Sequence, residues 1–235
     1  MRITPVLLAA ATLLIWHTAS AAPICTTGTL ASYESLGSAG CTVGQTDVAG
    51  FATVSGITGA TAIDPSTLVI TPTAGTSDAL LTFSLNLTAT TPALDEAIFT
   101  YTVTGPALLS DDIALSNSSE TVDGAVTDIQ NYCAGGQFGS DGVTGCSGSA
   151  TGTLLTLDGI QNTDQTSLLG PHLLNVTDDF TLDGGTAGSA TGGKFSDHFM
   201  FASPVPEPPA SILFLAGAVL AWRCKQQLAR RAVDV

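Results

Sequence analysis

Basic residues are nearly missing from the central part of this 235-residue chain. Residues 22–204 contain eighteen of the 20 acidic residues but only one of the six basic ones, Lys194. A surface that binds nucleic acid needs Lys and Arg side chains to neutralise phosphates. Nucleic acid is therefore excluded as a partner, and contact with an anionic polysaccharide would need bridging cations.

Common enzyme motifs are absent as well. The chain has neither a Gly-x-Ser-x-Gly nucleophile elbow nor a His-Glu-x-x-His zinc motif. Asp197 and His198 are adjacent, and an aspartate that orients a histidine base is one part of a catalytic triad. No serine stands out as the nucleophile, so we interpret His198 as a surface or strand-packed residue. We predict that the protein is not an enzyme and needs no cofactor.

Tryptophan does not occur in the central region. The two tryptophans, Trp16 and Trp222, lie in the apolar segments near the ends of the chain. Sugar-binding proteins often stack their ligands on exposed Trp or Tyr rings, so this absence weakens a carbohydrate-binding role without excluding it.

The C-terminal region combines a short apolar run with a basic tail. Residues 210–222 carry no charge and would form a helix of about 20 Å, against a hydrocarbon core of about 30 Å. Four basic residues follow, and by the positive-inside rule they would hold the C-terminus in the cytoplasm: Arg223, Lys225, Arg230 and Arg231. The pattern predicts a single transmembrane helix.

The residues before this run carry a family resemblance. Val205-Pro206-Glu207-Pro208, the apolar stretch and the basic cluster together resemble the PEP-CTERM sorting signal of exopolysaccharide-producing Gram-negative bacteria. The resemblance covers residues 205–231. It implies that exosortase, an integral-membrane processing enzyme, recognises Pro206, Glu207 and Pro208. Pro209 and the short apolar run depart from the family pattern, and a plain single-pass anchor is the alternative.

The N-terminus has the three regions of a secretory signal peptide. A basic start, an apolar stretch and small residues before Pro23 predict cleavage by signal peptidase after Ala21. The chain is thus divided into a signal peptide (1–21), an acidic extracytoplasmic domain (22–204) and a sorting signal (205–235).

Four cysteines lie in the central domain: Cys25, Cys41, Cys133 and Cys146. Four cysteines allow three disulfide connectivities, and the short separations favour Cys25–Cys41 with Cys133–Cys146. A zinc site, with His172 or His198 as further ligands, is the competing use of these residues.

Strand patterns dominate the central domain. Apolar and polar residues alternate through 81–88 and 97–103, which predicts two half-buried strands paired as a hairpin. Weaker strand patterns occupy 48–54, 67–70, 113–115, 121–129, 153–157, 173–182 and 195–201. Short strands separated by Gly, Pro and Asp turns predict an all-β fold, an antiparallel β-sandwich. The glycine-rich segment 184–193 is interpreted as a mobile loop.

One segment resembles the start of a calcium-binding loop. Asp179, Thr181, Asp183 and Gly184 have the spacing of its first ligands and its glycine, but Ala190 occupies the position of the bidentate Glu. An ordinary strand that ends in an Asp-Gly turn is the interpretation we favour, so no metal site is assigned.

These observations predict an exported protein of a Gram-negative cell surface or extracellular matrix, transiently anchored in the inner membrane. Its expected partners are signal peptidase, exosortase, the membrane and exopolysaccharide, in a structural role linked to biofilm. The alternative is a carbohydrate- or calcium-binding adhesin module.

Overall fold

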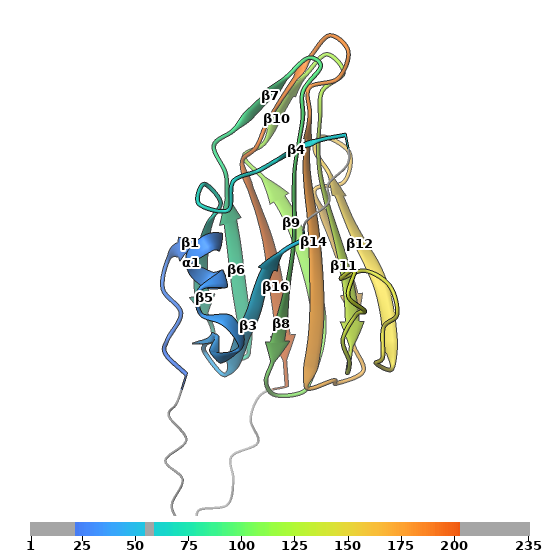
Figure 1. Cartoon of the computed structure of the whole chain (residues 1–235). Helices are drawn as coiled ribbons and strands as arrows, with labels where there is room; N and C mark the ends of the chain where they lie inside the picture. The colour runs from blue at the N-terminus through green and yellow to red at the C-terminus, as the bar shows by residue number, and fades with distance from the viewer. Residues whose placement is uncertain (1–21, 55–58, 203–235) are drawn as a thin grey trace, which may run out of the picture.

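The computed structural model describes residues 22–54 and 59–202. Two large β-sheets face each other, and a small third sheet lies at one end of them (Figure 1). Every pairing between strands is antiparallel except the short contact of β4 (Thr61–Ala62) with β8. The prediction of an all-β antiparallel fold is therefore confirmed.

The six-stranded sheet brings together strands from both ends of the domain. Its order is β1 (Gly28–Thr29), β5 (Val69–Ala74), β6 (Asp78–Ser84), β16 (Lys194–Phe201), β9 (Leu108–Ser116) and β13 (Thr163–Ser167).

The seven-stranded sheet contains β4 and six further strands. Their order is β12 (Ala150–Leu157), β11 (Ala125–Ala134), β14 (Leu173–Asp183), β8 (Leu94–Thr104), β3 (Thr46–Thr53) and β2 (Cys41–Val43). Two short helical segments, α1 (Leu30–Glu34) and a 3-10 turn (Gly37–Ala39), precede β2.

The third sheet has three short strands: β10 (Ser119–Thr121), β15 (Ser189–Thr191) and β7 (Thr88–Thr90). β15 lies inside the glycine-rich segment 184–193, so the interpretation of that whole segment as a loop is wrong. Ser189, Ala190 and Thr191 pair with β10 on one side and with β7 on the other.

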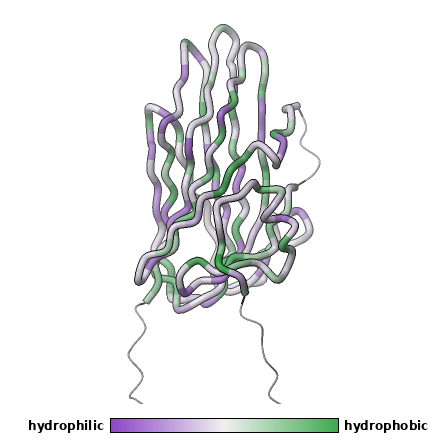
Figure 2. The backbone as a smooth tube through the Cα atoms, turned by 90° about the vertical axis from the view of Figure 1, so that its left-hand side faces the viewer, coloured by the Kyte–Doolittle hydropathy of each residue, from purple (hydrophilic) through white to green (hydrophobic). Residues whose placement is uncertain are grey.

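Alternating side chains build the core between the two large sheets. Along β6 every second residue is buried, and β8 shows the same pattern over most of its length. The alternation is visible as changing hydropathy along the strands (Figure 2). Aromatic rings from both sheets meet in the middle: the Phe83 and Phe99 rings are 5.2 Å apart, and the Tyr101 and Phe199 rings are 6.4 Å apart.

The predicted hairpin between 81–88 and 97–103 is wrong. β6 pairs with β5 and β16 in one sheet, whereas β8 pairs with β14 and β3 in the other. Between them the chain forms β7 and crosses to the opposite layer. Each strand has one apolar face that must be buried. Two such strands can bury these faces by lying opposite each other across the core, without being hydrogen-bonded neighbours in one sheet.

Both ends of the described domain lie at the same end of the molecule. Figure 1 shows the chain entering and leaving at the lower edge, while β7 and β10 lie at the upper edge. The small third sheet is therefore at the end opposite both chain ends.

Candidate functional site: an outer groove and a buried carboxylate cluster

The cysteines form the two disulfides that the sequence favours. Cys25 is bonded to Cys41 and Cys133 to Cys146, so the zinc alternative is wrong. Directly before Cys41, the chain passes close to β3 at Gly40. Gly40 has a φ of +58°, and a Cβ on it would lie 2.2 Å from the carbonyl oxygen of Val48. Only glycine fits this close approach of the two strands.

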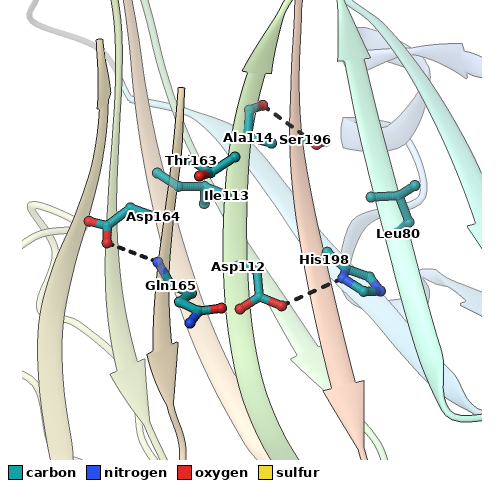
Figure 3. A pocket seen from close by; sticks show the side chains of 9 residues that line it. All are labelled: Leu80, Asp112, Ile113, Ala114, Thr163, Asp164, Gln165, Ser196 and His198. Atoms are coloured by element: carbon teal, nitrogen blue, oxygen red, sulfur yellow. Dashed lines mark hydrogen bonds and ion pairs between the residues drawn. The ribbon is translucent and has the colours of Figure 1, made fainter. Parts of the chain in front are cut away.

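A groove of about 700 Å³ runs over the outer face of the six-stranded sheet. Its lining comes from β6, β9, β13 and β16, four strands that are distant in sequence (Figure 3). Most of the side chains are polar or small: Asp112, Ala114, Thr163, Asp164, Gln165, Ser196 and His198, with Leu80 and Ile113 as the larger apolar residues.

His198 lies between two carboxylates in this groove. Its Nε2 is 3.1 Å from Oδ2 of Asp78, and its Nδ1 is 3.6 Å from Oδ2 of Asp112. The Nε2 contact is a hydrogen bond, whereas the Nδ1 contact is too long for one. The ring is about one-third exposed, at 35%, so a bound ligand could reach it.

A catalytic use of Asp197 and His198 is not supported by their placement. Neighbouring residues on a strand point to opposite faces, so Asp197 is buried between the sheets while His198 faces the groove. Ser196 lines the same groove, but its hydroxyl donates to the carbonyl of Ala114 at 3.5 Å. The three residues therefore do not form a triad.

Residues 179–184, which have the spacing of a calcium loop, belong to a strand and the turn that follows it. Asp179, Thr181 and Asp183 lie on the outward face of β14, which stays extended to its last residue. Asp183 then accepts a hydrogen bond of 2.8 Å from the backbone of Gly185. The segment is a strand that ends in an Asp-Gly turn, not a ligand loop.

A second group of carboxylates was missed by sequence reasoning. Asp111, Asp128, Asp178 and Asp197 are all completely buried, with 0% exposure. We call these four residues the buried carboxylate cluster. The sequence carried a signal for two of them. In the strand patterns 173–182 and 195–201, Asp178 and Asp197 stand at the same alternate positions as the apolar residues that face the core. An aspartate in such a register is directed into the core.

Burial changes the acidity of the cluster. Loss of solvent raises the pKa values of Asp111, Asp128 and Asp178 well above the usual range, and the charge of Asp197 raises each of them further. Burial raises the pKa of Asp197 to about 6, while a hydrogen bond from the Tyr101 hydroxyl acts in the opposite direction. Each of the four carboxyl groups therefore keeps its proton to a higher pH than an exposed aspartate does.

In residues 22–54 and 59–202, no three His, Cys, Asp or Glu side chains are arranged to hold a metal ion. The same ranges contain no helix long and apolar enough to cross a membrane. The signal peptide (1–21), the sorting residues Pro206, Glu207 and Pro208, and the basic tail lie outside the described residues.

The structure is that of an antiparallel all-β protein with two disulfides. Disulfides persist in oxidising compartments, so the two bonds indicate an environment outside the cytoplasm. In comparisons with protein-family models, with curated proteins and with solved structures, nothing matched the chain.

Proposed function

We propose that the protein is an exported, non-enzymatic component of a Gram-negative cell surface or extracellular matrix. The C-terminal signal would hold it in the inner membrane until exosortase acts near Pro206-Glu207-Pro208. The observation that carries the proposal is the order of features in residues 205–231: a proline-rich motif, an uncharged run and a basic cluster. The two disulfides agree with export.

The placement of the chain ends supports this route. Both the N-terminal and C-terminal ends of the described domain leave from the same edge (Figure 1). A domain held by its C-terminal side would keep that edge toward the membrane and direct the end with β7, β10 and β15 away from it. The acidic surface would keep such a domain soluble and self-repelling.

Substitution of the motif tests the sorting step. In the producing cells, with an epitope tag after Val235, we expect Glu207→Ala to leave most of the protein membrane-bound with its tag attached. The parent protein should reach the surface fraction without the tag. Asp234→Ala removes a carboxylate from the tail outside the motif and is the matched control. Recovery of the parent surface protein with residues 212–231 still attached would favour a plain membrane anchor instead.

The groove around His198 favours a second candidate function, a module that binds neutral saccharides. Asp112, Gln165 and His198 offer hydrogen-bond acceptors and donors on one face. We expect His198→Ala to weaken binding in a neutral-polysaccharide pull-down by about fivefold, the loss of one hydrogen bond worth about 1 kcal/mol. The control is His172→Ala, because His172 is exposed and its ring contacts the carbonyl of Gly105. Equal retention of both variants, with or without calcium, would reject the binding role.

A further inference from the structure

The buried carboxylate cluster joins the two large sheets. Asp111 on β9 and Asp197 on β16 come from the six-stranded sheet. Asp128 on β11 and Asp178 on β14 come from the seven-stranded sheet. The cluster therefore lies across the interface on which the fold depends.

Asp197 makes a polar contact between the two layers. The hydroxyl of Tyr101, on β8 in the opposite sheet, donates to Oδ2 of Asp197. Asp178, also from the opposite sheet, is within hydrogen-bonding reach of Asp197. Two carboxylates cannot hydrogen-bond to each other without a proton, so this contact becomes a bond only when one of the pair is a carboxylic acid.

Most oxygens of the cluster have no donor from the protein. Among the described residues, neither oxygen of Asp111, Asp128 or Asp178 has a hydrogen-bond partner. The neighbouring hydroxyl of Thr156 is also buried and unpartnered, and the buried side-chain amide of Gln130 lies close enough to Asp197 to lower its pKa. Unpaired buried acceptors of this kind are costly. Protons on the carboxyl groups would supply the missing donors.

Within residues 22–54 and 59–202, no Lys or Arg side chain offsets the charge of the cluster. The single lysine in the described ranges, Lys194, is exposed at the start of β16, and His198 lies on the outer face of the same strand. Ionisable groups face the cluster from β8, β9, β11, β14 and β16, and all are acids or a phenol. They are Tyr101, Asp111, Asp128, Asp178 and Asp197, with Asp112 and Asp179 close enough from the outer faces to add repulsion.

We propose that the buried carboxylate cluster is a proton-operated lock between the two sheets. With protons bound, the carboxylic acids hydrogen-bond across the interface and hold the layers together. When they ionise, like charges repel in a dry interior, and the two layers separate more readily. The domain is therefore most stable in acidic surroundings and weakens as its surroundings become alkaline.

Proton linkage sets the direction in which stability changes with pH. The folded domain binds protons that the unfolded chain releases, because the folded pKa values are raised. The stability contributed by Asp197 is fully present below pH 3.8 and is lost as pH rises to about 6. A gap of about two pKa units corresponds to a roughly hundredfold rise in the unfolding equilibrium constant. The more strongly raised residues would extend the loss to higher pH.

Thermal unfolding of the mature protein recovered from the producing cells tests the lock. Circular dichroism should show a melting temperature that falls steadily from pH 4 to pH 9. The fall should persist when salt is raised from 0.05 to 0.5 M, because salt screens exposed charges far more than buried ones. A melting temperature that is constant, that rises with pH, or whose fall disappears in high salt would overturn the proposal.

Amide substitutions identify the groups responsible. Asp197→Asn cannot ionise but keeps the shape of the acid, so it should flatten the pH profile and melt higher than the parent at pH 8. Asp178→Asn should act in the same direction and serves as the second variant if the first does not fold. The control is Asp47→Asn, at an exposed position of β3, which should keep the parent profile. If neither Asp197→Asn nor Asp178→Asn changes the slope of melting temperature against pH, the pH dependence does not come from the buried carboxylate cluster and the proposal is overturned.

A metal ion is the competing occupant and has its own outcome. At pH 8 and constant ionic strength, the melting temperature should be the same in EDTA, CaCl2 and KCl. Stabilisation by either cation that disappears in Asp197→Asn would assign the cluster to a metal and overturn the proton lock.

Discussion

The aromatic core offers a direct test of how the sheets are joined. Phe195 on β16 is 1% exposed and stacks on two rings, Phe83 of its own sheet and Phe180 of the opposite sheet, each at 4.6 Å. Replacing Phe195 by alanine removes both stacks and leaves a cavity between the layers. Substitutions of this kind cost about 3–5 kcal/mol, a large share of the roughly 5–15 kcal/mol that stabilises an ordinary domain.

A graded series makes the magnitude informative. Phe195→Leu keeps most of the volume and loses the ring contacts, so we expect a cost of about 1–2 kcal/mol. Met200→Ala on the same strand is the control, because Met200 is 42% exposed and surface changes usually stay within about 0.5 kcal/mol. Urea unfolding followed by far-ultraviolet circular dichroism measures all three variants at one pH. The slope of the free energy against urea should not change.

The order of the three costs decides the outcome. If Phe195→Ala loses no more stability than Met200→Ala, the ring does not lie between the sheets and the two-layer arrangement is wrong. A large loss for alanine with a small one for leucine would show that volume dominates at this position. Equal large losses would instead show that the stacked rings themselves stabilise the contact.

The remaining predictions concern the disulfides. Replacing Cys133 and Cys146 together by serine opens the loop between two residues that are 13 positions apart. We expect the free energy of unfolding in urea to fall by about 3 kcal/mol. Replacing Cys25 and Cys41 opens a loop between residues that are 16 positions apart and should cost about the same. A reducing agent should destabilise the parent protein but leave a variant without both pairs unchanged; an equal effect on that variant would contradict the assignment.

Much of the local structure could be read directly from the sequence. Alternation located the strands that became β6, β8, β14 and β16, because a strand with one buried face needs an apolar residue at every second position. The disulfide partners were also predictable, since cysteines 13 and 16 residues apart meet readily within one local unit. The export signals at both ends are a matter of composition and order, and they remain predictions.

Strand partners could not be predicted in the same way. Alternation states which face of a strand is buried but not which strand lies beside it or across from it. The chain between β6 and β8 is long enough either to turn back or to cross the core, and local turn chemistry does not decide between the two. The hairpin prediction failed for that reason.

The sequence by itself determined an acidic, disulfide-bonded, β-rich chain with targeting patterns at its ends, because these properties depend on composition and short spacings. Only the tertiary structure decided that Asp111, Asp128, Asp178 and Asp197 meet between the sheets and that Asp197 and His198 face opposite ways. Contacts between residues as far as 120 positions apart, such as Asp78 and His198, arise from how whole strands are stacked, and that choice is made by burial of the complete core.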